Sequence, residues 1–108
     1  MQNRLFAIAL LLSSFYLHAS DRSEHIRSNY AKYEYQIPMR DGVKLFTSVY
    51  IPYDRSKEYP ILLLRTPYSV RPYGSDNYPG WLGPTEEFEE VGYIFAFQDV
   101  RGCYMSEG

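Results

Sequence analysis

An apolar strand that runs directly into a polar, glycine-containing loop is the feature that most narrows the possible folds. Residues Tyr93–Phe97 are all apolar or aromatic, and the polar segment Gln98–Gly102 follows at once. This pattern is typical of the carboxyl edge of a sheet in α/β proteins, where functional loops begin. Because a further helix or strand is expected soon after such a loop, we expect the chain, which ends at Gly108, to be the front part of a larger α/β protein.

The preceding residues predict three more strands. Tyr33–Ile37 alternates polar and apolar residues, Arg40–Gly42 is a turn signal, and Lys44–Ile51 is rich in β-branched and aromatic residues. Together these segments predict an antiparallel hairpin. Pro60–Leu64 is a continuous apolar run, which is typical of a strand covered on both faces.

A short helix is predicted between the last two strands. Pro84 and Thr85 precede two acidic residues, which are favoured in the first turn of a helix by its dipole. We expect Phe88 and Val91 to form its buried side and Gly92 to end it. The predicted order is therefore an antiparallel hairpin followed by strand, loop, helix and strand, which is the opening of an incomplete α/β sheet.

The N-terminus has the composition of a secretory signal peptide. A short positive segment ending at Arg4 precedes an apolar run from Leu5, and small residues lie at Ala19 and Ser20. We therefore expect residues 1–20 to be a signal peptide, residues 21–32 a polar segment, and the mature protein to be periplasmic or extracellular and free of the membrane. A membrane anchor or a buried helix remains the alternative for the same residues.

Charge and cysteine content exclude several classes of function. The net charge is −2 and no basic cluster is present, so nucleic acid is not an expected partner. The single cysteine, Cys103, cannot form an internal disulfide, and it excludes Cys-rich metal frameworks. We expect no metal and no cofactor.

A long aromatic loop is predicted over residues 66–84, which we call the aromatic loop. The chain contains 12 tyrosines, and several of them alternate with proline and glycine in this segment, where a regular helix or central strand is improbable. Loops of this length in a compact domain usually carry function. The alternative is a loop that only packs its rings over the edge of the sheet.

The order of these segments resembles the peptidase S15 family, also called the CocE/NonD or X-Pro dipeptidyl-peptidase-like hydrolases. The blocks that carry the resemblance are Ile37–Leu45 (IPMRDGVKL), Tyr59–Ile61 leading to Arg65–Tyr68 (RTPY), and Gly92–Gly102. The resemblance implies an α/β-hydrolase core with a helical cap and a jelly-roll domain. Residues 33–108 would supply only the first strands of that core.

The resemblance also implies one catalytic residue in this chain. In the family, the tyrosine of the RTPY block donates its hydroxyl to the oxyanion hole, and Tyr68 occupies that position. A tyrosine hydroxyl, with a pKa of about 10, stays neutral and can donate a strong hydrogen bond to a developing oxyanion. Losing such a donor typically costs roughly 3–4 kcal/mol of transition-state stabilisation. An exposed aromatic without a catalytic role is the alternative for Tyr68.

Other candidate residues flank this position. We expect Tyr73, Tyr78 and Trp81 to bind substrate by shaping the acyl pocket. Arg65, Asp99 and Arg101 are expected to form a structural ion pair at neighbouring strand ends, in preference to contacting a substrate carboxylate. No Gly-x-Ser-x-Gly nucleophile elbow occurs in the sequence, and Ser106 has no strand directly before it.

Three functions from different classes follow. The chain is the N-terminal fragment of an exported serine hydrolase acting on a small-molecule or peptide ester or amide, with its catalytic triad outside this sequence and no activity of its own. Alternatively, it is a small exported binding module with Tyr73, Tyr78 and Trp81 as a stacking platform, or a truncated, poorly soluble product with an unpaired edge at Tyr93–Phe97. The oligomeric state is left open.

Overall fold

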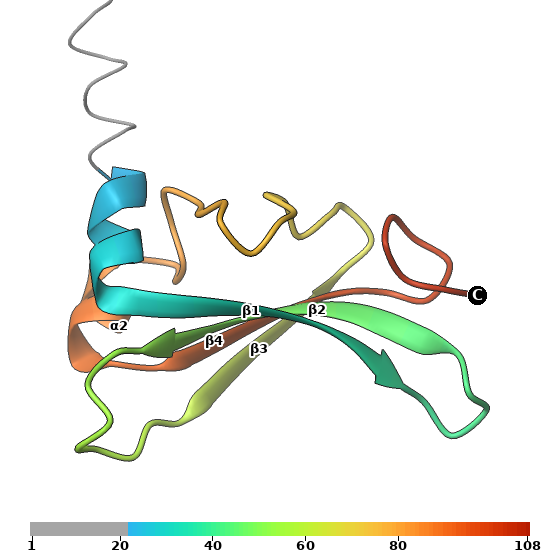
Figure 1. The fold of residues 1–108 in the computed structure, drawn as a ribbon, viewed down its shortest axis with the longest axis horizontal. Coiled ribbons are helices and arrows are strands. Elements are labelled where there is room, and N and C mark those ends of the chain that lie inside the picture. Colours follow the sequence, from blue (N-terminus) through green and yellow to red (C-terminus); the bar gives the residue numbers. More distant parts are fainter. Residues whose placement is uncertain (1–21) are drawn as a thin grey trace, which may run out of the picture.

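A single mixed sheet organises the computed structural model, which describes residues 22–108. The strand order is β1-β2-β4-β3, with β1 and β2 antiparallel, β2 and β4 antiparallel, and β3 and β4 parallel (Figure 1). The strand bounds are β1 Tyr30–Pro38, β2 Lys44–Pro52, β3 Ile61–Thr66 and β4 Ile94–Asp99. The predicted α/β arrangement, a hairpin followed by strand, loop, helix and strand, is confirmed.

The described residues begin with a helix over residues 22–29, which falls within the predicted polar segment. The predicted signal peptide, residues 1–20, lies outside the described residues. Within residues 22–108, no helix is long and apolar enough to cross a membrane.

The hairpin forms as the sequence predicts, with longer strands: both extend by one residue at their C-terminal ends, to Pro38 and Pro52. Its turn is closed by the Met39 amide, which donates to the Val43 carbonyl at 2.8 Å, and Gly42 adopts a φ of +87°, where a side chain would be strained. Strand β1 begins at Tyr30 rather than at Tyr33. The three added residues are paired in register with β2, which extends the ladder beyond the alternating segment.

Strand β3 is less covered than its apolar sequence predicts. It pairs only with β4, and Ile61 and Leu63 are 67% and 49% exposed. The expectation of a strand covered on both faces is wrong within residues 22–108, because Ile61 and Leu63 on one face and Leu64 on the other are exposed. The expected unpaired edge at Tyr93–Phe97 is also wrong, since β4 is paired on both sides.

The short helix α2, Glu86–Val91, has the predicted ends and part of the predicted buried side. Thr85 is its N-cap and Gly92, with a φ of +95°, follows its last residue. Phe88 packs against the core as predicted, whereas Val91 is 75% exposed, contrary to the prediction, and Glu89 is buried. Burial of this acid is possible because its carboxylate lies 2.7 Å from the guanidinium of Arg22 and also accepts the Leu82 amide at 3.0 Å.

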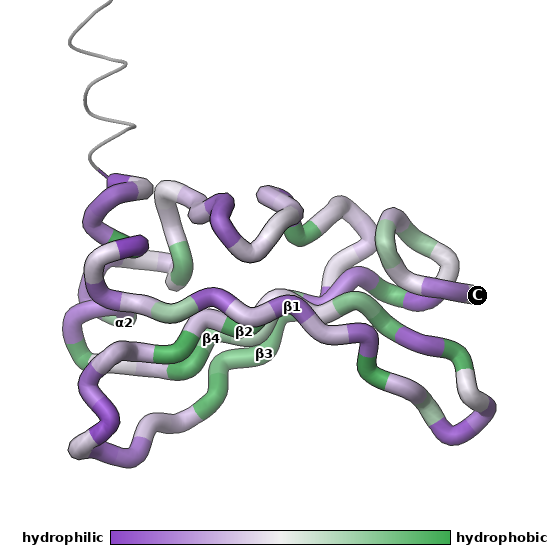
Figure 2. Tube along the Cα trace, viewed as in Figure 1, coloured by the Kyte–Doolittle hydropathy of each residue, from purple (hydrophilic) through white to green (hydrophobic). Residues whose placement is uncertain are grey.

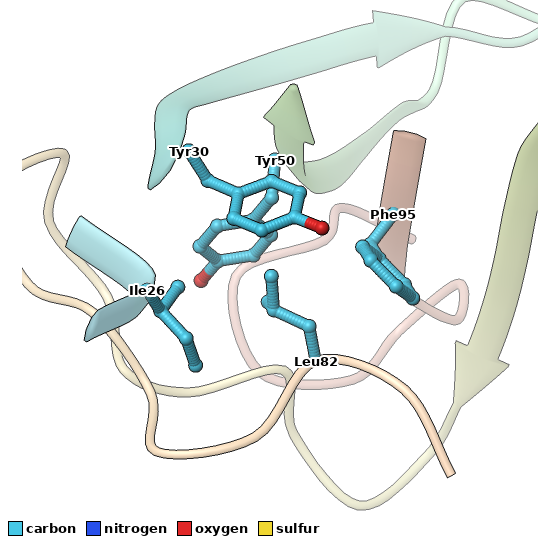
Figure 3. Packing of buried hydrophobic residues seen from close by; sticks show 5 residues of the cluster. All are labelled: Ile26, Tyr30, Tyr50, Leu82 and Phe95. Carbon is cyan, nitrogen blue, oxygen red and sulfur yellow. The ribbon is translucent and has the colours of Figure 1, made fainter. Parts of the chain in front are cut away.

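The core lies between one face of the sheet, the 22–29 helix and the end of the aromatic loop. Its fully packed members converge in Figure 3 and are Ile26, Tyr30, Tyr50, Leu82 and Phe95. The hydrophobic residues of the sheet concentrate along β3 and β4, whereas the helix and the aromatic loop are more polar (Figure 2). The helix contributes Ile26 and the aromatic loop contributes Leu82 to this core, and both pack on aromatic rings of the sheet.

Candidate functional site

The loops that carry the candidate residues leave the sheet side by side. Strands β3 and β4 are parallel with Thr66 opposite Asp99, and the Val100 amide donates to the Thr66 carbonyl at 3.2 Å. The aromatic loop and the loop after β4 therefore start from the same carboxyl edge. This is the edge at which open α/β sheets place their functional groups.

Tyr68 lies at the start of the aromatic loop with its side chain open to solvent. It is 82% exposed, and its backbone amide donates to the Thr66 hydroxyl oxygen at 3.0 Å. Its hydroxyl makes no hydrogen bond with any of residues 22–108, whereas the next residue, Ser69, has a φ of +83°. The side chain is thus free to donate to an external acceptor, from a sharply bent backbone.

The aromatic loop runs across one face of the sheet (Figure 1) and is attached to β1 by a buried lysine. Lys32 is 6% exposed, and its ammonium donates to the carbonyls of Pro72, Gly74 and Asn77 at 2.7, 2.9 and 2.7 Å. Burial lowers the pKa of Lys32, and the Glu34 carboxylate opposes that shift. The lysine therefore satisfies three carbonyls of a segment that has no regular structure.

Three further hydrogen bonds continue this attachment along β1. The Gly74 amide donates to the Glu34 carboxylate at 2.9 Å, and the Tyr78 hydroxyl donates to the Tyr30 carbonyl at 3.0 Å while accepting the Lys32 amide at 3.1 Å. Sequence reasoning assigned no role to Lys32, because it ended the polar segment there. Its two-residue spacing from Tyr30 and Glu34 was the available signal, since alternate strand residues share one face.

Both the hydroxyl and the ring of Tyr73 have partners within the protein. Its hydroxyl donates to Asp99 Oδ2 at 2.9 Å and lies 2.9 Å from the Ser69 hydroxyl, and its ring packs edge-on against Phe46. Burial raises the pKa of Tyr73, the Ser69 hydroxyl lowers it and the Asp99 carboxylate raises it again. This arrangement gives Tyr73 a clear structural role; the substrate-binding role remains a prediction.

Tyr78 and Trp81 also have intramolecular partners. The guanidinium of Arg27 lies 4.8 Å from the centre of the Tyr78 ring, and that of Arg22 lies 4.6 Å from the Trp81 ring. A flat stacking platform requires open ring faces, so these contacts disfavour the binding-module alternative. Trp81 nevertheless remains 59% exposed.

Trp81 lines a cavity beneath the aromatic loop. This cavity, of about 200 Å³, also contacts Ser69 and Val70, the two residues after Tyr68, and Phe97 of the sheet. Tyr73 and Tyr78 do not line it. A larger cavity of about 410 Å³ lies by Gly92, at the opposite, amino end of β4, where functional groups of parallel strands are not expected.

The three charged candidates are not paired as predicted. Arg101 forms its ion pair with Asp41 of the hairpin turn at 2.9 Å, and this contact holds the Asp41 pKa below its usual range. Arg65 is exposed and forms no ion pair within the part of the chain that the structure describes. Asp99 is 0% exposed and is surrounded by hydrogen-bond donors without charge. Amide and hydroxyl donors replace the expected guanidinium, so no buried cation is needed.

The hydroxyl of Ser106 forms hydrogen bonds with backbone groups of two strands. Its hydroxyl donates to the Asp99 carbonyl at 2.6 Å and accepts the Phe46 amide at 2.8 Å. Among residues 22–108 no group of three or more His, Cys, Asp or Glu side chains is arranged to hold a metal ion. The Tyr68 hydroxyl remains able to donate a hydrogen bond to an acceptor outside residues 22–108.

Comparison with known proteins identifies similar sequences. Residues 41–108 match the profile of the X-Pro dipeptidyl-peptidase (S15 family). The cocaine esterase of Rhodococcus sp. (strain MB1 Bresler) is 40% identical over 75 residues, which cover 67% of this chain and 12% of the esterase.

Solved structures agree with the sequence comparison. An α-amino acid ester hydrolase is 44% identical with a TM-score of 0.59, and an aminopeptidase from the marine sediment archaeon Thaumarchaeota archaeon is 40% identical with a TM-score of 0.60. Each comparison covers 74% of this chain and 14% of the solved chain. The chain thus spans about one seventh of the length of these relatives.

Proposed function

The chain belongs to the X-Pro dipeptidyl-peptidase (S15) family of hydrolases, and we propose that it forms the N-terminal part of an exported serine hydrolase that transfers an acyl group from an ester or amide to water. In this reaction a serine oxygen attacks the carbonyl carbon, and the leaving alcohol or amine departs with a proton. Water then releases the acid. The relatives named as an esterase, an ester hydrolase and an aminopeptidase all act at such carbonyls.

The role of this chain in the reaction is to stabilise the oxyanion through Tyr68. The observation that carries this proposal is the exposed, unbonded hydroxyl of Tyr68 at the carboxyl edge of the sheet. A donor that is not engaged within its own domain can be directed at the negative oxygen that develops in the tetrahedral intermediate. Serine, acid and base would come from sequence outside this chain, because no nucleophile elbow occurs in it.

Substrate contacts are proposed for the aromatic loop. Trp81 is the best supported of the three candidates, because it lines the cavity that adjoins Ser69 and Val70. Tyr73 and Tyr78 would act by holding the loop that carries it. The expected substrate is a small-molecule or peptide ester or amide whose acyl side chain fits an apolar pocket.

Export is proposed from the composition of residues 1–20. A short positive segment, an apolar run and small residues before Asp21 favour secretion and cleavage, which would leave the mature enzyme in the periplasm or outside the cell. The mass of the mature protein tests this part of the proposal. A mass that still includes residues 1–20 would contradict it.

The catalytic part is tested by Tyr68→Phe in the complete enzyme. We expect kcat for an ester such as a p-nitrophenyl ester to fall about 100-fold or more with little change in KM, because the hydrogen bond forms mainly in the transition state. Tyr35→Phe is the matched control, since Tyr35 is 48% exposed on the other face of the sheet. An unchanged kcat in Tyr68→Phe contradicts the oxyanion role.

A further inference from the structure

A buried carboxylate lies between the two loops that begin at the carboxyl edge. Asp99 is the last residue of β4 and 0% exposed, and it lies opposite Thr66, two residues before Tyr68. A carboxylate at such a site must have its oxygen atoms satisfied by donors. The identity of these donors shows what Asp99 holds in place.

The donors come from both loops. Asp99 Oδ1 accepts the Val70 amide at 3.1 Å, and Oδ2 accepts the Tyr73 hydroxyl at 2.9 Å and the Met105 amide at 3.3 Å. One side chain therefore ties the aromatic loop to the loop after β4. Hydrogen bonds to a charged acceptor are stronger than those between neutral groups, which makes this connection stiff.

Tyr68 depends on this connection because its side chain is 82% exposed and its hydroxyl forms no hydrogen bond within residues 22–108. The Tyr68 amide donates to the Thr66 hydroxyl oxygen. Two residues later, the Val70 amide donates to the Asp99 carboxylate. Ser69 lies between them at a φ of +83°, a conformation that a side chain rarely adopts without support. The Ser69 hydroxyl is 2.9 Å from the Tyr73 hydroxyl, which is itself bonded to Asp99.

We propose that Asp99 is the positioning residue that aims Tyr68 at the oxyanion, through its hydrogen bonds to the Val70 amide and the Tyr73 hydroxyl. This inference rests on the proposed function of Tyr68. Asp99 itself touches no reacting atom, since its carboxylate is enclosed. It acts by keeping the bent backbone at Ser69 in one conformation, so that the Tyr68 hydroxyl occupies one place. Small displacements of such a donor are costly to the reaction rate.

The test is a double-mutant cycle in the complete enzyme between Asp99→Ala and Tyr68→Phe. We expect Asp99→Ala to lower kcat about tenfold or more with KM changed less than about threefold. In the Tyr68→Phe background, the same change should lower kcat less than about threefold, because a misplaced hydroxyl and an absent one are equivalent. Arg101→Ala removes an exposed charge from the same loop and should leave kcat unchanged.

Two outcomes overturn the positioning role. One is an unchanged kcat in Asp99→Ala, and the other is a full tenfold loss in both backgrounds, which indicates a general structural effect. If Tyr68→Phe itself leaves kcat unchanged, the proposed role of Tyr68 fails and the positioning role of Asp99 fails with it. If Tyr68→Phe lowers kcat as expected but Asp99→Ala lowers kcat equally in both backgrounds, only the positioning role of Asp99 fails.

A second variant and a second measurement test the proposal if Asp99→Ala does not fold. Asp99→Asn keeps the volume and one acceptor oxygen, and it should show the same coupling with a smaller decrease in kcat. Hydrogen exchange of the Val70 amide gives a readout independent of activity, because the Asp99 carboxylate is its acceptor. Faster exchange in the Asp99 variants supports the proposal, and unchanged exchange overturns it.

Discussion

Tyr30 is the residue at which burial and hydrogen bonding combine most clearly. It is 4% exposed, its ring packs edge-on against Phe95, and its hydroxyl donates to the Glu89 carbonyl at 2.9 Å. Burial raises the pKa of Tyr30 to about 12, with the Glu89 carboxylate and Tyr59 adding to the shift. The folded protein therefore favours the neutral form of the Tyr30 side chain.

This shift predicts a loss of stability at alkaline pH. The pKa of Tyr30 is higher in the folded state than its usual value of 10.0, so its contribution is complete below pH 10 and is lost as the pH rises toward 12. The loss should reach about 2 kcal/mol at pH 12. Tyr30→Phe should be about 1 kcal/mol less stable at pH 8, because it lacks the hydrogen bond to Glu89.

Comparing the wild type with Tyr30→Phe separates the contribution of Tyr30 to the pH dependence of stability from that of other groups that titrate in this range. Urea unfolding followed by circular dichroism at pH 8, 10, 11 and 12 should show a shallower decline for Tyr30→Phe than for the wild type. Tyr33→Phe, at a 40% exposed position, serves as the control and should follow the wild type. Parallel curves for wild type and Tyr30→Phe would contradict the prediction.

At the scale of the element, α2 shows how a very short helix is held by tertiary contacts. Six residues are too few for a helix to be stable alone, and its apolar Val91 contributes no burial. The element is attached through Phe88, which packs against the core, and through Glu89, which accepts from Arg22 and from the Leu82 amide. Arg22 in turn donates to the Gly80 carbonyl at 3.2 Å, so its ion pairs and this hydrogen bond join the 22–29 helix, the aromatic loop and α2.

Removing this carboxylate should destabilise all three segments. We expect Glu89→Gln to lower the free energy of unfolding by about 3 kcal/mol, because the partly buried Arg22 loses its closest, buried counter-charge and keeps only the exposed Glu86 at 3.7 Å. Urea unfolding measures the change. Glu87→Gln, an exposed position on the same helix, is the matched control and should change stability by less than about 0.5 kcal/mol. Equal effects of the two variants would contradict the assignment.

At the scale of the whole molecule, the two faces of the sheet differ. The face toward the aromatic loop carries Lys32, Tyr50 and Asp99, which are buried. The opposite face carries a row across all four strands, in the register Tyr33, Val49, Ala96 and Leu63. Tyr33 and Leu63 at the ends of this row are exposed, as is Ile61 beside them on β3. An apolar, partly open face next to an unpaired strand edge favours self-association.

This face predicts the behaviour of the chain when it is produced alone. Leu63→Lys should reduce its self-association, measured by light scattering or sedimentation at equal concentration, because it places a charge on the exposed apolar row. Val91→Lys adds the same charge at a 75% exposed apolar position on α2, away from the sheet, and should have no effect. If both variants self-associate less to the same extent, the effect is due to net charge and not to the exposed apolar face of the sheet.

Much of the fold followed from local patterns. The hairpin, its glycine turn at Gly42, the start of α2 after Thr85 and its end at Gly92 are confirmed, since each depends on the conformational preferences of a few adjacent residues. Tyr68 was placed by its motif, and its exposure agrees with a donor role, which remains a prediction.

What only the tertiary structure decided are the partners of the polar side chains and the coverage of each strand. Lys32 became the anchor of the aromatic loop, Asp99 gained neutral donors in place of arginine, and Arg101 paired with the distant turn at Asp41. β3 became an edge although its residues are apolar. Turn and strand preferences act between neighbours in the sequence and can be read from it, whereas the partner of a buried charge depends on which distant segments the fold brings within hydrogen-bond distance.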